Sequence, residues 1–302
     1  MTMQRFFKPA MLISLAIILV AVVMTLCGCG MNLGLDFAGG LSMPYDLGKT
    51  AAQPDVAALL GSDYSVTIQG EKKTECLVRM KDVGAEDVQD VQSAVTVKLQ
   101  SAYPGAVPAG EVSYVGPVAG ATLVKNAVTA VLIAAVLMLC YIAWRFDVHS
   151  GLAAVLALLH DVAVMLAFMV ICRSVIELNS SFIAAALTIV GYSINDTIVI
   201  FDRIRSNAKE HPEMDKAELV SVSVKESLGR TIMTTVTTLV TITALYILGV
   251  TAIKEFALPI IVGVIAGTWS SNLISGYIWA WLEEKFPKKE KSSDEDEDED
   301  DE

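Results

Sequence analysis

Six long runs almost free of charge constrain this chain more than any other feature. They cover residues 11–27, 127–143, 151–171, 181–201, 231–250 and 258–281 of a chain of 302 residues. Each run approaches the roughly 20 residues that a helix needs to cross a bilayer. Arg5 and Lys8 precede the first run as they would in a signal peptide, but five further runs favour an uncleaved helix. The sequence therefore predicts an α-helical polytopic membrane protein with six transmembrane helices.

Lysine and arginine concentrate in alternate connections between these runs, which predicts the orientation of the chain. Basic residues occupy the N-terminus, the turn at Arg145, the stretch 203–230 and the segment after Trp281, whereas the opposite short loops hold only Arg173 and Lys254. Because basic connections of membrane proteins stay in the cytoplasm, both termini are expected there. The predicted parts are the N-terminus and first helix at 1–30, an extracytoplasmic domain at 31–120, and a five-helix bundle at 121–285 with a cytoplasmic loop at 202–230.

The remaining segment, 286–302, is an acidic tail that dominates the formal charge. It ends in nine consecutive acidic residues from Asp294 to Glu302; without them 22 basic residues face 25 acidic ones, so the net charge changes from −12 to −3. Such a run predicts a disordered, solvated cytoplasmic terminus. The five cysteines show neither metal-ligand spacing nor a disulfide framework. We expect no cofactor, no metal site and no nucleic-acid partner.

The extracytoplasmic segment follows the order strand, helix, strand, strand, helix, strand. Strands are predicted at 41–47, 64–69, 75–80 and 111–115, and helices at 54–60 and 85–102. This order is that of a small split βαβ, or ferredoxin-like, α+β domain. The segment contains no nucleophile, metal cluster or phosphate loop. Contact with another protein chain and service as a passive spacer both stay open.

Asp196 is the most informative single residue, because it interrupts an apolar run of membrane length. A charged side chain at the centre of a membrane helix costs roughly 2.5–3.5 kcal/mol, so it usually has a partner or a function. Tyr192, Ser193 and Thr197 lie on faces adjacent to Asp196 through their spacing. This pattern predicts a site that handles a proton or an ion. A fixed hydrogen bond or salt bridge that locks two helices is the alternative.

Arg230 begins a polar stripe on the next run, which continues through Thr234, Thr237, Thr238 and Thr241. If this stripe faces Asp196, the two helices form a hydroxyl-lined path with an acid near one end. Arg230 also stands where a basic anchor at the cytoplasmic boundary would be placed, so both explanations stay open. The supporting polar residues of the predicted site are Ser193, Asn195, Thr197 and Thr234.

Three further patterns predict how the helices contact one another or the membrane. His160 and Asp161 lie near the middle of the run 151–171. Adjacent residues of a helix point about 100° apart, so we do not expect both to face one partner. A structural contact and a proton relay are equally compatible with this pair. Gly263, Gly267 and Ser271 recur every four residues, which predicts a closely packed helix face. The amphipathic segment 215–228 is expected to lie on the membrane surface.

Several motifs resemble the SecD/SecF family of protein-export membrane subunits. The longest is Gly191–Arg205, and Gly34–Gly40 is similar to the family signature that follows the first span; Val115–Val118, Leu159–Asp161 and Arg230–Thr234 fit as well. The resemblance covers nearly the whole chain except the acidic tail. Ala38 and Gly229 replace a threonine and a serine that are common in the family, without removing an ionisable group.

The resemblance implies a six-span SecF-type subunit in the bacterial cytoplasmic membrane, half of a resistance-nodulation-division-type transporter. It implies a SecD partner and association with the SecYEG channel, through which the SecA motor drives preproteins. In that family the pair is thought to use the proton-motive force to promote export. Residues that match Asp196 and Arg230 are implicated there in proton movement, and we add His160 and Asp161 as candidates.

Two other hypotheses compete with this one. A half of a small-molecule or lipid exporter of the same superfamily is the first, although such exporters usually carry two six-span halves and two outer domains in one chain. A scaffold that stabilises the channel without moving protons is the second. No hydrolytic or cofactor constellation is present in the sequence, so we do not expect an enzyme.

Overall fold

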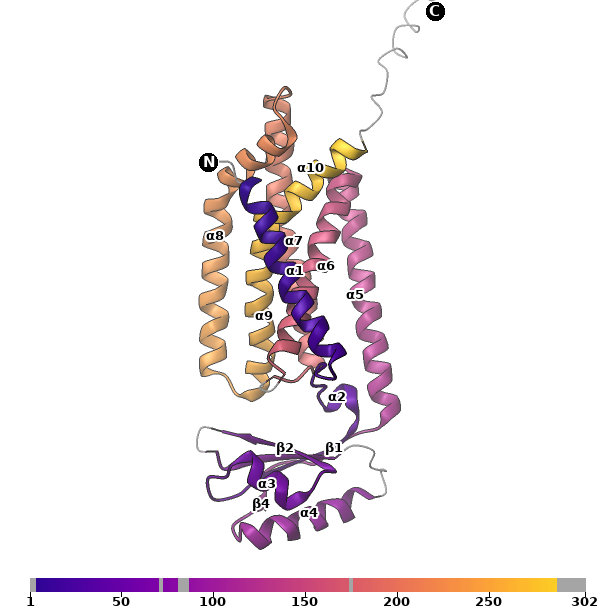
Figure 1. Ribbon diagram of the computed structural model, residues 1–302, viewed down its shortest axis with the longest axis vertical. Coiled ribbons are helices and arrows are strands. Elements are labelled where there is room, and N and C mark those ends of the chain that lie inside the picture. The colour runs from indigo at the N-terminus through magenta and orange to yellow at the C-terminus, as the bar shows by residue number, and fades with distance from the viewer. Residues whose placement is uncertain (1–3, 71–72, 81–86, 174–175, 287–302) are drawn as a thin grey trace, which may run out of the picture. The chain divides into compact units, whose positions relative to one another are not determined.

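The computed structural model describes residues 4–70, 73–80, 87–173 and 176–286 (Figure 1). It divides into two compact units, a sheet-containing unit at Cys27–Leu132 and Cys172–Ala184, and a helical unit at Met1–Leu26, Ile133–Ile171 and Ala185–Glu302. The acidic run predicted to be disordered lies outside the described residues.

The sheet-containing unit holds an antiparallel sheet whose described strands run in the order β2-β3-β1-β4, with β5 also paired to β1. The strands are β1 (Gly40–Asp46), β2 (Tyr64–Gln69), β3 (Glu75–Met80), β4 (Val107–Pro108) and β5 (Ser113–Val115). The four predicted strands are present, although the last begins two residues later than expected. The sequence did not reveal β4, because two residues are too few to show an alternating pattern.

Helices α3 (Gln53–Leu60) and α4 (Val88–Ala102) cover one face of this sheet (Figure 1). Val56 from α3 and Val95 and Leu99 from α4 are fully buried against strand residues that include Tyr45. The Tyr45 hydroxyl donates to the Gln92 carbonyl at 3.1 Å, which ties α4 to β1. The predicted small α+β domain is therefore confirmed.

A segment far along the chain completes this unit. The Gly34 N–H donates to the Leu178 carbonyl at 2.8 Å, and the Leu178 N–H donates to the Asn32 carbonyl at 2.7 Å. Asp36, in the short helix α2 (Leu35–Ala38), accepts hydrogen bonds from the backbone and the hydroxyl of Ser180. These contacts join residues more than 140 positions apart, so local sequence patterns could not predict them.

Cys76 of β3 supplies a prediction about this unit. Its side chain is 2% exposed, and burial raises the pKa of the thiol to about 11 from an ordinary value of 9.0. Because the thiolate is the reactive form, we expect native Cys76 to resist alkylation at neutral pH, whereas Cys29, which is exposed and lies outside the spans, reacts; peptide-resolved mass spectrometry measures both.

The sign of the pH dependence follows from the same shift. Below about pH 9 the thiol is neutral in both states, and ionisation does not affect stability. Between about pH 9 and pH 11 the unfolded chain ionises first, so the domain loses stability as pH rises. Native labelling of Cys76 as fast as that of Cys29 would contradict the burial.

The long apolar helices correspond to the membrane spans. Among the described residues, six helices are long and apolar enough to cross a membrane, as predicted. They are α1 (Gln4–Leu26), α5 (Pro117–Arg145), α6 (Val148–Ile171), α7 (Ser180–Glu210), α8 (Lys216–Leu248), and a sixth made of α9 (Thr251–Ser270), a π-helical turn (Ser271–Ser275) and α10 (Gly276–Lys285). Helix α9 packs against both α6 and α8, and α1 packs against α6 (Figure 1).

Glycines let α9 approach its neighbours closely. A Cβ added to Gly263 would lie 2.4 Å from a side-chain carbon of Ile189 on α7 and 2.8 Å from the sulfur of Met165 on α6. Small residues allow membrane helices to approach in this way. The predicted closely packed face at Gly263 and Gly267 is confirmed.

The amphipathic segment before the fifth span is not a separate surface helix, so that prediction was wrong. Helix α8 is continuous from Lys216, where Asp215 caps it by accepting the Ala217 N–H at 3.1 Å. Its 33 residues extend about 50 Å, longer than the roughly 30 Å hydrocarbon core. The apolar residues Leu219 and Val224 pack against side chains of α7, and this packing replaces the expected contact with lipid.

Candidate functional site

Asp196 lies inside the helical unit rather than on its surface. Its helix, α7, places the side chain so that only 4% of the residue is exposed. The carboxylate oxygen Oδ2 is buried and has no hydrogen-bond partner among the described residues. A buried acid without a fixed partner is costly in a membrane helix, so this oxygen gives no support to the alternative of a hydrogen-bonded lock between helices.

Arg230 of α8 is near Asp196 but not bound to it. The charge of Arg230 acts on the Asp196 carboxyl, yet no ion pair joins the two among the described residues. Arg230 itself is exposed. The structure thus brings the two predicted residues into the same neighbourhood while leaving their charges separate.

Asp161 of α6 is a second buried acid, and it is fully hydrogen-bonded. It is 0% exposed, and its Oδ2 accepts the hydroxyl of Ser193 at 2.6 Å. Ser193 lies on α7, three residues before Asp196, so this bond links α6 to the helix that carries Asp196. A Cβ at Gly267 would lie 3.0 Å from the Ser193 Cβ and 3.5 Å from Asp161 Oδ2. Glycine at this position therefore allows α9 to pack closely against the Asp161–Ser193 hydrogen bond.

His160 and Asp161 face different surroundings, as their angular separation predicted, but they also contact each other. The His160 Nδ1 lies 3.0 Å from Asp161 Oδ1. On its other side His160 lines an apolar cavity of about 440 Å³ with residues of α1 and α9, among them Ser14 and Trp269. The His160 Nε2 is buried without a partner among the described residues. The pair therefore connects this cavity to Ser193.

A group of hydroxyls extends the site toward the sixth span. The hydroxyls of Thr197 and Ser271 lie 2.9 Å apart, and they lie 3.1 and 3.4 Å respectively from the Ser193 carbonyl oxygen. Ser271 begins the π-helical turn, a distortion that is frequent at functional sites. The sequence analysis placed Ser271 on a packing face but missed its polar contact; the cluster of serines at 270, 271 and 275 is the signal that marks it.

The polar stripe expected on α8 does not line the site. The hydroxyls of Thr234, Thr237 and Thr241 bond to carbonyls of their own helix, and Thr237 and Thr241 are exposed. Thr231 and Thr235 are buried instead. Within this chain α8 is rotated so that Thr235, rather than the predicted stripe of Thr234, Thr237, Thr238 and Thr241, meets Thr268 of α9 at 2.8 Å. The hydroxyl-lined path through that stripe stays a prediction.

Asn195 also stands apart from the buried group. It is exposed, whereas Asp196 and Thr197 beside it are buried. Successive residues on a helix differ by about 100° in direction, so the rotation that buries Asp196 turns Asn195 outward. Its supporting role toward Asp196 stays a prediction, with no contact in the described residues to support it.

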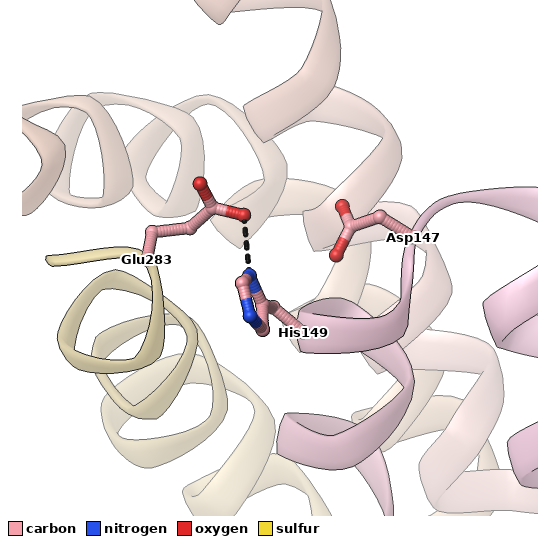
Figure 2. A group of neighbouring side chains, drawn as sticks. All are labelled: Asp147, His149 and Glu283. Atoms are coloured by element: carbon pink, nitrogen blue, oxygen red, sulfur yellow. Dashed lines mark hydrogen bonds and ion pairs between the residues drawn. The ribbon is translucent and has the colours of Figure 1, made fainter. Parts of the chain in front are cut away.

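A cluster of Asp147, His149 and Glu283 offers metal-ligand atoms within 4.8 Å of one another (Figure 2). His149 Nδ1 lies 2.8 Å from Glu283 Oε1, which ties α6 to α10. Asp147 accepts the Ser150 N–H at 2.8 Å at the start of α6. The cations Arg205, Lys209 and Lys216 line the adjoining cavity and disfavour a metal ion there. We therefore assign the cluster a structural role.

Comparison with known proteins identifies the family. Residues 94–285 match the family described as protein export membrane protein SecD/SecF, C-terminal. The protein translocase subunit SecF of Rickettsia felis is 35% identical over 262 residues, which cover 85% of this chain and 84% of the relative. SecF of Gemmatimonas aurantiaca is 35% identical over 301 residues, which cover 94% and 87%. The chain belongs to the SecD/SecF family.

A solved structure extends this SecF-type relationship to the fold. The crystal structure of SecDF from Thermus thermophilus, a translocon-associated membrane protein, aligns with a TM-score of 0.78 and 34% identity over 92% of this chain. The aligned part is 38% of that longer chain. The predicted family and fold class are confirmed, and the chain is a multi-pass translocase subunit of the Sec export machinery, not an enzyme.

Proposed function

We propose that this SecF-family subunit uses the proton-motive force, together with a SecD partner, to promote preprotein export across the bacterial cytoplasmic membrane. The observation that carries the proposal is the buried Asp196 oxygen without a hydrogen-bond partner among the described residues. A carboxyl that no fixed donor holds ionised is able to gain and lose a proton as its surroundings change. Intramembrane acids of this kind mark proton relays in transporters.

Arg230 supplies the second element of the proposed cycle. When Arg230 approaches, its guanidinium pairs with the Asp196 carboxylate, and the proton leaves; when Arg230 withdraws, the acid binds a proton again. The absence of an ion pair between the two groups among the described residues supports such an exchange, because no fixed contact opposes it. One charge that crosses the membrane provides about 2.3 kcal/mol per 100 mV, which suits conformational strokes rather than bond chemistry.

Asp161 and His160 form a second polar pair that contacts the same helix. Asp161 accepts the Ser193 hydroxyl, so a change in its protonation alters a bond to α7 one helical turn from Asp196. We propose that this pair senses or relays protons alongside Asp196, with Ser193, Thr197 and Ser271 as the connecting hydroxyls. Thr234, whose hydroxyl bonds to carbonyls of its own helix, and Asn195 remain candidate supporting residues.

Partners, orientation and domain boundaries belong to the same proposal. A SecD partner is supported by the name and the length of the SecDF relative, of which this chain matches 38%. From the distribution of basic residues, we place both termini and the acidic tail at 286–302 in the cytoplasm and residues 31–120 outside. The bundle at 121–285 spans the membrane. The further proposed partners are the SecYEG channel, the preproteins that SecA drives through it, and the lipid bilayer that surrounds the spans.

A reconstitution experiment tests this function. Vesicles that contain SecYEG and a SecD subunit, with or without this chain, receive SecA, ATP and a labelled preprotein, and protease-protected preprotein is measured. We expect an imposed proton gradient to increase export only when this chain is present, and a protonophore to remove the increase. An increase that survives the protonophore would contradict proton coupling, and copurification of the SecD subunit with this chain checks the partnership separately.

A further inference from the structure

A basic cavity lies where α5 ends beside α7, away from the residues of the proposed proton site. Its volume is about 320 Å³, and it is lined by Arg145 from the last turn of α5 and by Asp202, Arg205, Ser206 and Lys209 from α7. Three cationic side chains and one acidic side chain give these walls a net charge of +2. Such a surplus of positive charge indicates an anionic ligand.

Aromatic side chains place this cavity at the membrane surface. Trp144, the neighbour of Arg145, is 85% exposed, and Tyr141 one turn earlier is 47% exposed. Exposed tryptophan and tyrosine at the end of a membrane helix mark the level of the lipid headgroups. Helix α7 has 31 residues, about 46 Å, so its last turns, with Arg205 and Lys209, extend beyond the hydrocarbon core.

The cations of the cavity make one ion pair among the described residues, although Arg205 and Lys209 also line the neighbouring cavity that holds Asp147 and Glu283. Arg145 lies 3.8 Å from Asp202, and their side chains are 48% and 64% exposed, so this pair contributes little stability. Arg205 donates to the Arg145 carbonyl at 3.2 Å, which fixes its guanidinium at the end of α5. Lys209 makes no ion pair in the described part of the chain.

We propose that this cavity binds the phosphodiester headgroup of an anionic phospholipid. Guanidinium groups bind phosphate oxygens through paired donors, and lysine adds a point charge. Basic pockets between membrane helices at this level are suited to lipid headgroups. Ile133, Val136 and Leu137 on α5 are more than half exposed and provide an apolar surface for the acyl chains. A soluble phosphate shares the headgroup chemistry but would make no use of that surface.

Native mass spectrometry of the detergent-purified full chain tests the site. The chain is mixed with phosphatidylglycerol or with phosphatidylcholine at equal ratios, and the fraction that retains lipid is measured. We expect retention of phosphatidylglycerol only, and about a fivefold weaker retention in Lys209→Gln, since one cation near the membrane surface contributes about that factor. Lys209 makes no ion pair among the described residues, so this variant is expected to fold normally, which circular dichroism checks.

Lys225→Gln is the matched control, because Lys225 is an exposed lysine of α8 that does not line the cavity; its retention of phosphatidylglycerol should equal that of the unmodified chain. Equal losses in both variants, or equal retention of phosphatidylcholine, would overturn the site. Complete displacement of the lipid by excess inorganic phosphate would assign the cavity to soluble phosphate and overturn the lipid.

Discussion

Replacement of Asp196 by asparagine is expected to abolish the gradient-dependent part of preprotein export. Asparagine has nearly the same shape as aspartate but cannot gain or lose the proton. Asp196 Oδ2 makes no hydrogen bond among the described residues, so the change breaks no observed contact and the subunit should remain inserted. In the reconstituted vesicles, an imposed proton gradient should then leave the amount of protease-protected preprotein unchanged, while export driven by SecA alone continues.

Glu210→Gln is the matched control for this variant. Glu210 ends the same helix and is exposed, so the same chemical change at that position should preserve the full response to the gradient. Copurification with the SecD subunit shows that each variant still assembles. If the Asp196→Asn subunit responds to the gradient like the unmodified one, a scaffold that moves no protons becomes the better explanation.

Gly263→Ala is expected to destabilise the helical unit more than any other single methyl addition discussed above. The new Cβ would lie 2.4 Å from a side-chain carbon of Ile189 and 2.8 Å from the sulfur of Met165. Both side chains are themselves buried, so relief requires the helices to move apart. Overpacking of this kind costs about 1–3 kcal/mol, and the thermal unfolding midpoint of the detergent-purified chain should fall by several degrees.

Gly191→Ala separates this packing effect from a general effect of adding a methyl group. Gly191 lies on α7, and a Cβ there would meet no atom within 4 Å. Because alanine favours a helix over glycine by about 0.8–1.0 kcal/mol, this variant should unfold at the same temperature or higher. A similar fall in both variants would show that the close approach at Gly263 is not the cause.

Much of the fold could be predicted because it depends on local composition. The spans, the alternating strands and the glycine repeat are each visible within about 20 residues of sequence, and each was confirmed. Asp196 stood out for the same reason, since a carboxyl in an apolar run is conspicuous. Its burial is consistent with the prediction, whereas its protonation remains for the export experiment to test.

What the sequence left open is how each helix is rotated and where it ends. Threonines occupy positions 231, 234, 235, 237, 238 and 241, so several stripes on α8 were compatible with the sequence. The contact between Thr235 and Thr268 fixes the rotation of α8. In that rotation Thr231 and Thr235 are buried and Thr237 is exposed. Similarly, packing of Leu219 against α7 makes the segment before the fifth span part of a long helix.

The sequence by itself determined which segments cross the membrane and that an acid lies within one of them, because the free energy of inserting a helix depends on the side chains of that segment alone. Only the tertiary structure decided that Asp161 bonds Ser193, that Arg230 and Asp196 stay apart, and that Leu178 joins the sheet-containing unit. Those contacts depend on the rotation and depth of whole helices, which result from packing among residues far apart in the chain.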